Sequence, residues 1–174
     1  MRIITVIFLA CIACTTLSAQ TEFPKPDGLA PANGYSHVVT AKPGKLVFIA
    51  GQVANDKQGK LVGKDDLKAQ TVQVFENLKT ALAAAGATFD DVVKITWYVK
   101  GYKTEYLRIL RDVRNSYVNK DKPPASTLVG VAALFQDDYM LEVDAMAVVP
   151  EKHSGKNNGS ATTLGSIYKG CTQS

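Results

Sequence analysis

Apolar residues between positions 67 and 85 recur at three, four and seven residues, the spacing that places side chains on one face of a helix. These positions are Leu67, Val74, Phe75, Leu78, Leu82 and Ala85. Asp65 and Asp66 come before them, where carboxylates complement the helix dipole, and Gly86 follows as a C-terminal stop. The pattern predicts a helix that starts at Asp65-Asp66 and ends at Gly86.

Two other segments alternate between apolar and more polar residues. Apolar residues at 93, 95, 97 and 99 are separated by more polar ones, which is the period of a half-buried strand. The same period runs over 140–149, where Glu142 points away from Leu141 and Val143. Both segments are therefore predicted to be strands with one buried face.

The region before the first helix is predicted to hold two short strands. Residues 20–33 are rich in Pro, Ala and Gly and are expected to form an irregular lead-in. Residues 35–42 and 46–50 are β-prone runs, and the Pro43-Gly44 pair between them is a turn signal. We therefore expect a β-hairpin here.

A second helical face follows the strand at 93–99 and ends before Pro123-Pro124. Its apolar positions are Tyr106, Leu110, Val113 and Tyr117. A strand around 127–131 comes before the one at 140–149. The resulting order, ββαβαββ, predicts an α+β domain over residues 34–150, in which two helices lie on one face of a mixed sheet.

The first 19 residues have the layout of a secretory signal peptide. Arg2 gives a positive start, residues 3–13 form an apolar run, and Leu17-Ser18-Ala19 places small residues at a cleavage site. The run is too short to span a bilayer as a helix of the mature protein. We expect cleavage after Ala19, export to the periplasm or the extracellular space, and no membrane attachment afterwards.

Cleavage leaves one of the three cysteines, Cys171, in a polar tail over residues 151–174 that is expected to be flexible. A lipoprotein signal is the weaker alternative, because Cys11 lies too early for a full apolar segment and Cys14 follows a poor match. The domain itself has no cysteine, so packing rather than disulfides must stabilise it.

Composition narrows the range of functions. A formal net charge of +4, which falls by one when Arg2 is removed, comes without a basic stripe, so we expect no nucleic-acid binding. The histidines are His37 and His153 alone, which gives neither a metal cluster nor a paired-histidine ribonuclease site. No nucleophile elbow or phosphate loop occurs, and we expect no cofactor.

Five sequence motifs, in order along the chain, together resemble the sequence of one known protein family. They are Gly34-Tyr35-Ser36, Val47 to Gln52, Gln70 to Gly86, Asp91-Val92-Val93-Lys94, and Pro124 to Leu134 with the later Leu141-Glu142-Val143. Together they resemble the Rid family, which comprises RidA, YjgF and the liver perchloric-acid-soluble proteins. The resemblance covers residues 35–149 and implies a chorismate-mutase-like homotrimer with small-molecule clefts between neighbouring subunits.

The best-studied branch of that family hydrolyses 2-imino and enamine acids to 2-keto acids and ammonia. The resemblance implies that an arginine binds the substrate carboxylate and that Glu142 positions or activates water as the catalytic carboxylate. Ser126 stands where that arginine is expected, so a neutral hydroxyl replaces a bidentate cation. Ala50 likewise replaces a family serine.

Four further residues are candidates for substrate binding. Tyr35 aligns with a family tyrosine that lines the cleft, and Arg111 on the second helix lies where it can compensate for Ser126. Thr127 offers a hydroxyl group, and Gly51 more simply serves the turn after its strand. Each also has a purely structural interpretation, as a packed aromatic, a solvated cation, a strand residue or a turn residue.

Three functions stay open at this point. The first is an imine or enamine hydrolase with Glu142 as acid, base or water-positioning group, whose activity is altered or lost because of Ser126. The second is a non-catalytic trimer that binds a small molecule such as an imino or keto acid. The third, a ribonuclease or translation inhibitor, rests on family labels, and both export and the shortage of histidines argue against it.

Overall fold

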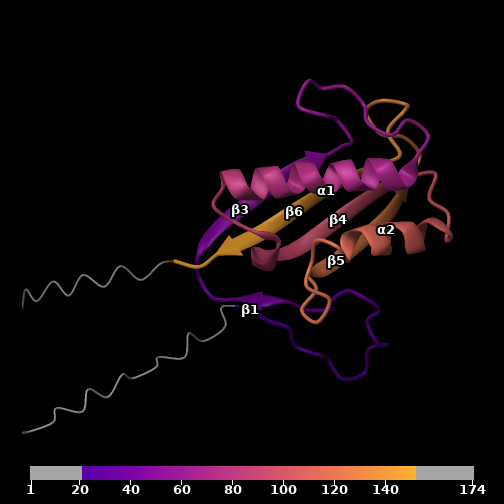
Figure 1. Ribbon diagram of the computed structural model, residues 1–174. Helices are drawn as coiled ribbons and strands as arrows, with labels where there is room; N and C mark the ends of the chain where they lie inside the picture. The colour runs from indigo at the N-terminus through magenta and orange to yellow at the C-terminus, as the bar shows by residue number, and fades with distance from the viewer. Residues whose placement is uncertain (1–20, 152–174) are drawn as a thin grey trace, which may run out of the picture.

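A computed structural model describes residues 21–151 of the chain (Figure 1). The predicted signal peptide and all but the first residue of the predicted polar tail, Cys171 included, lie outside the described residues. Within residues 21–151, no helix has the length and apolar character needed to cross a bilayer.

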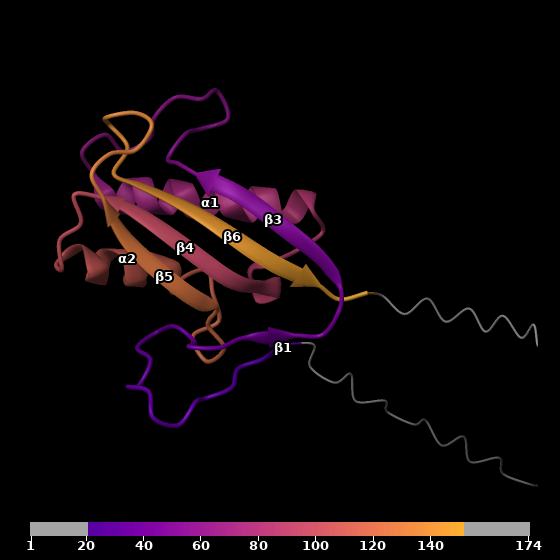
Figure 2. The same ribbon diagram turned by 180° about the vertical axis from the view of Figure 1, so that it is seen from behind.

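Four strands form the main sheet in the order β3-β6-β4-β5. They are β3 (Lys45–Gln52), β4 (Val92–Lys100), β5 (Ala125–Val131) and β6 (Leu141–Val149). Strand β6 runs antiparallel to both β3 and β4, whereas β5 is parallel to β4. Helices α1 (Leu67–Ala84) and α2 (Tyr106–Arg114) cover one face, and Figure 2 shows the other face uncovered. The predicted α+β class, with two helices on one face of a mixed sheet, is confirmed.

Helix α1 begins and ends where its sequence signals lie. The Asp66 side chain caps the helix by accepting a hydrogen bond from the Ala69 N–H at 2.9 Å. Gly86, just beyond the last turn, has φ +72°, the left-handed conformation that favours glycine. The prediction from the apolar spacing is therefore confirmed at both ends.

The core lies between α1 and the sheet. Phe75, Leu78 and Leu82 of α1 are fully buried and form one cluster with Ile95 and Trp97 of β4. The ring centroids of Phe75 and Trp97 are 5.3 Å apart. Burying each side chain of this size contributes about 1.5–3 kcal/mol, which fixes α1 on the sheet.

The predicted hairpin over residues 35–50 is wrong. Only Thr40–Ala41 forms a strand in its first half (β2), and β2 pairs with β1 (Thr21–Glu22) in the lead-in. Strand β3 pairs with β6 instead. The reason lies at Ser36, whose N–H and Oγ donate to the carbonyls of Pro124 and Pro123 at 3.2 and 2.7 Å. These bonds hold the segment against the start of β5, away from β3.

Candidate functional site

The sheet divides the candidate residues between its two faces. Ser126 is paired with Ile95, whose side chain is buried on the helix side. Thr127 is paired with Thr96, and Glu142 with Tyr98, both on the uncovered side. The prediction that Glu142 points away from Leu141 and Val143 is confirmed, because those two side chains are buried in the core.

A cavity of about 170 Å³ lies between α2 and the sheet, and we call it the α2 pocket. Its lining residues are Asn33, Tyr35, Trp97, Leu107, Arg111, Arg114, Ser126 and Leu128. Three predicted site residues, Tyr35, Arg111 and Ser126, therefore meet in one place although they come from three separate parts of the chain. Arg111 and Ser126 are both half-buried there.

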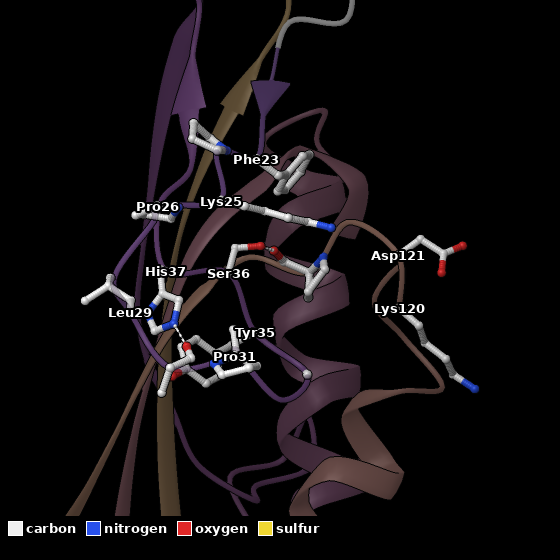
Figure 3. A pocket seen from close by; sticks show the side chains of 15 residues that line it. Phe23, Lys25, Pro26, Leu29, Pro31, Tyr35, Ser36, His37, Lys120 and Asp121 are labelled. Atoms are coloured by element: carbon white, nitrogen blue, oxygen red, sulfur yellow. Dashed lines mark hydrogen bonds between the residues drawn. The ribbon is translucent and has the colours of Figure 1, made fainter.

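Tyr35 reaches the α2 pocket because its segment runs beside β5. Ser36 forms a parallel bridge with Ala125, so Tyr35 and Ser126 flank this bridge on the two segments and line the same pocket. The Tyr35 ring meets the His37 ring edge-on at 5.1 Å, and the His37 Nε2–H donates to the Ala30 carbonyl at 2.8 Å. Both rings also line a larger cavity of about 360 Å³ between the lead-in and the loop of Lys120, across which Lys25 extends (Figure 3). Tyr35 thus forms part of the wall of two adjoining cavities.

Arg114 is a pocket residue that the sequence analysis missed. It is only 7% exposed, and its Nη2 donates to Asn115 Oδ1 at 2.8 Å, whereas the buried Nε has no hydrogen-bond partner. Burial, and secondly the charge of Arg111, lower the pKa of the Arg114 guanidinium. Arg114 follows Arg111 by three residues, a spacing that places both on one side of a helix. That spacing was the available signal in the sequence.

Within residues 21–151, the charge of Arg114 has no carboxylate partner. All 16 Asp and Glu side chains of the sequence lie within residues 21–151. The ion pairs formed there involve Lys64, Lys79 and Lys100 and leave both Arg111 and Arg114 without one. The α2 pocket therefore combines two cations with the hydroxyls of Tyr35 and Ser126.

On the uncovered face, Gly51 and Glu142 are in direct contact. A Cβ atom built on Gly51 would lie 1.7 Å from Glu142 Oε1 and 2.6 Å from Cδ. Gly51 lies within β3, where the register to β6 shifts, so it does not serve the turn after the strand as expected. Its role is to leave room for the Glu142 side chain.

Thr127 belongs to a polar group on the same face. The Lys94 ammonium donates to Thr127 Oγ1, and the Tyr98 hydroxyl donates to Asp144 Oδ2 at 3.2 Å. Burial lowers the pKa of Lys94, and the hydrogen bond to the Asp144 carboxylate raises the pKa of Tyr98. These contacts orient the polar side chains beside Glu142.

One chain thus presents two separate sets of groups. The α2 pocket carries cations and hydroxyls, while Glu142 and its neighbours lie beyond the sheet on the other side. The sheet therefore separates Glu142 from the α2 pocket of the same chain. Within residues 21–151 no group of His, Cys, Asp and Glu side chains is arranged to hold a metal ion.

Comparison with known proteins places the chain in a family. Residues 26–149 match the family model described as Endoribonuclease L-PSP. A RutC family protein of Pyrococcus horikoshii is 39% identical over 125 residues, which cover 71% of this chain and 90% of the relative. A Rid-family protein of unknown function from Yersinia pestis has a similar structure, with a TM-score of 0.70 at 35% identity over 75% of this chain and 100% of that one. The chain therefore belongs to the Endoribonuclease L-PSP family, which includes the RutC and Rid proteins.

Proposed function

We propose that this protein is a homotrimer that binds small imino acids in clefts between its subunits and hydrolyses them to keto acids and ammonia. The observation that carries the proposal is the division of the site between two faces of the sheet. Arg111, Ser126 and Tyr35 lie under α2, and Glu142 lies on the uncovered face. A complete site therefore requires the α2 pocket of one subunit and the Glu142 of the next.

The uncovered face has the composition of a subunit interface. Phe48 and Leu46 of β3 are 69% and 59% exposed, and Met146 of β6 and Val129 of β5 are 37% and 40% exposed. Large apolar side chains gathered on one face of a soluble domain mark a contact surface. The Lys94, Tyr98 and Asp144 group lies among them, so the face combines apolar contact with polar specificity.

The proposed reaction assigns a role to each half of the cleft. The α2 pocket holds the substrate carboxylate, and Glu142 of the neighbouring subunit orients a water molecule towards the imine carbon. The water oxygen bonds to that carbon while Glu142 accepts one water proton and passes it to the nitrogen, which gives a carbinolamine. Glu142 then transfers the hydroxyl proton to the nitrogen, the carbonyl forms as the C–N bond breaks, and ammonia leaves the 2-keto acid.

The test is turnover of 2-iminobutanoate, generated in situ, by the protein from Gln20 onward, corrected for spontaneous hydrolysis. Glu142→Gln should lower kcat by about a hundredfold, since a positioned acid–base group contributes about 10²–10⁴. Glu105→Gln is the matched control, because it makes the same chemical change at an exposed carboxylate outside both halves of the cleft and should change kcat by less than about threefold. Equal losses in both variants, or no turnover by the unaltered protein, would contradict hydrolysis.

Binding without chemistry is the second candidate, and Ser126 favours it. The resemblance implies an arginine at this position, and a neutral serine binds a carboxylate less strongly. In that case the protein would bind 2-oxobutanoate saturably and leave 2-iminobutanoate unchanged. Isothermal titration calorimetry beside the turnover assay distinguishes the two candidates.

We also propose that the protein acts outside the cytoplasm. This proposal is supported by residues 1–19, in which a positive charge is followed by an apolar run and then by small residues at a cleavage site. Mass spectrometry of protein recovered from the periplasm or the medium should give the mass of residues 20–174. Recovery of the uncut chain from the cytoplasm alone would contradict export.

A further inference from the structure

The Arg114 guanidinium lacks part of the hydrogen bonding that a buried cation needs. Its side chain is more than nine-tenths buried, and its Nε–H has no acceptor. Buried polar atoms are almost always paired, and a buried charge is unfavourable unless it is both paired and hydrogen-bonded. The described part of the chain supplies a single acceptor, Asn115 Oδ1, and no carboxylate.

A structural role explains only part of this arrangement. Arg111 and Arg114 lie in the last turn of α2, where cations complement the helix dipole. An exposed cation satisfies that role equally well, so the dipole does not account for burial. Gly34 shows that the chain leaves room for this guanidinium: its φ is +77°, and a Cβ there would lie 2.7 Å from Arg114 Nη2.

Arg114 also lies beside the position where the resemblance implies a carboxylate-binding arginine. Ser126 and Arg114 line the same pocket, and Arg111 lines it with them. An adjoining cavity of about 120 Å³ continues along Arg111 and Arg114 as far as Lys120. The small Ser126 side chain leaves this space open to a group that approaches from α2.

We propose that Arg114, assisted by Arg111, is the carboxylate-binding group of the cleft and supplies from helix α2 the cation that strand β5 lacks. Two neighbouring N–H groups of a guanidinium match the two oxygens of a carboxylate, and this guanidinium lacks a full set of acceptors within residues 21–151. Trp97, Leu107 and Leu128 form the apolar part of the wall, so the pocket fits a small carboxylate with a short apolar side chain. Carboxylate binding by Arg114 does not depend on the proposed function, whereas the choice of a 2-imino or 2-oxo acid and the catalytic role rest on it.

Calorimetric titration with 2-oxobutanoate, and with its uncharged methyl ester, tests the inference. Arg114→Gln should weaken binding of the acid about tenfold or more, and Arg111→Gln by a smaller factor. Arg108→Gln, an exposed arginine of the same helix, is the matched control and should bind within about twofold of the unaltered protein. The ester should bind weakly to every variant. Unchanged affinity in folded Arg114→Gln, or no binding by the unaltered protein, overturns the inference.

A second measurement needs no variant and guards against a folding defect. The Arg114 Nε–H signal in ¹H–¹⁵N NMR spectra should shift when 2-oxobutanoate is added and not when the ester is added. A signal that stays in place at saturation overturns the inference.

Turnover separates this inference from the proposed function. If binding of 2-oxobutanoate depends on Arg114 but 2-iminobutanoate is not turned over, the inference is supported and the hydrolase proposal is contradicted. If 2-iminobutanoate is turned over with the same KM by Arg114→Gln and by the unaltered protein, the hydrolase proposal is supported and the inference is contradicted.

Discussion

The Glu142 carboxylate lies against the α-carbon of Gly51, in the space that the Cβ of any other residue would occupy. A Cβ at position 51 would come within 1.7 Å of Glu142 Oε1 and 2.8 Å of Cγ. The backbone of Gly51 does not adopt the left-handed conformation, so the contact with Glu142, rather than φ, is the reason for a glycine. The pair positions the acid on the uncovered face of the sheet.

Gly51→Ala should therefore displace the flexible Glu142 side chain from its rotamer and lower the free energy of unfolding by about 0.5–1.5 kcal/mol. In a Glu142→Ala background the clashing atoms are gone, and the same change should stabilise the protein by about 0.4–1 kcal/mol through lost backbone entropy. A double-mutant cycle in urea measures both effects. Equal effects in the two backgrounds would show that Gly51 serves something other than Glu142.

The uncovered face gives a second prediction, about assembly. Phe48→Glu places a charge at the most exposed large apolar side chain of the face and should convert a trimer into monomers at micromolar concentration. Val72→Glu, at an exposed position of α1, is the control and should leave the trimer intact. Sedimentation equilibrium measures the mass of each variant. A monomeric unaltered protein, or a trimeric Phe48→Glu variant, would contradict the interface.

Restoring an arginine on β5 gives a third prediction. Ser126→Arg adds a third guanidinium to a pocket that already holds those of Arg111 and Arg114. Crowding and like charge should lower the free energy of unfolding by about 1–3 kcal/mol without improving 2-oxobutanoate binding. In Ser126→Arg combined with Arg114→Gln, the cation is only moved, and affinity should return to within about threefold of the unaltered protein. A large gain in affinity from Ser126→Arg alone would show that the pocket lacks a carboxylate-binding group.

Tyr117 gives a fourth prediction, for alkaline pH. Burial first, and then the hydrogen bond from its hydroxyl to Glu76 Oε1 at 2.8 Å, raise the pKa of Tyr117 to about 12. An unfolded tyrosine ionises near pH 10, so between about pH 10 and 12 the folded state holds a proton that the unfolded state has lost. The contribution of Tyr117 to stability is therefore complete below about pH 10 and is lost as the pH rises towards 12.

Tyr117→Phe removes this contribution, so its free energy of unfolding should fall less steeply over the same range. At neutral pH the variant should lose about 1 kcal/mol with the hydrogen bond. Urea unfolding at several pH values measures both quantities. An identical alkaline slope in the variant and the unaltered protein would contradict the assignment.

The elements that the sequence predicted correctly depend on local periodicity. The apolar spacing of α1 and the alternation in β4 and β6 indicate which side chains are buried. Each pattern lies within one short segment, so it can be recognised without knowing the rest of the fold. The hairpin over residues 35–50 failed because strand pairing is not local. The partner of β3 is β6, about a hundred residues away along the chain.

Part of the candidate site was also predictable from the sequence, because most of its residues were identified before their positions in the structure were known. Tyr35, Arg111 and Ser126 do meet in one pocket, and Glu142 does lie on the side expected from its neighbours. Arg114 escaped notice because most arginines on a helix are solvated, and only the packed structure shows that this one is buried without a full set of acceptors.

The central claim is that each site is built from two subunits, and mixing two defective variants tests it most directly. Glu142→Gln and Arg114→Gln, carrying different tags, are co-expressed, and mixed trimers are purified through both tags. Turnover of 2-iminobutanoate is then measured at a substrate concentration below KM. If Glu142 and Arg114 of neighbouring subunits share a cleft, every trimer that carries both tags has one cleft of its three with both halves intact, and activity should rise well above that of either variant alone. If the two residues act within one chain, every site keeps a defect, and mixed trimers no more active than the separate variants would contradict the account.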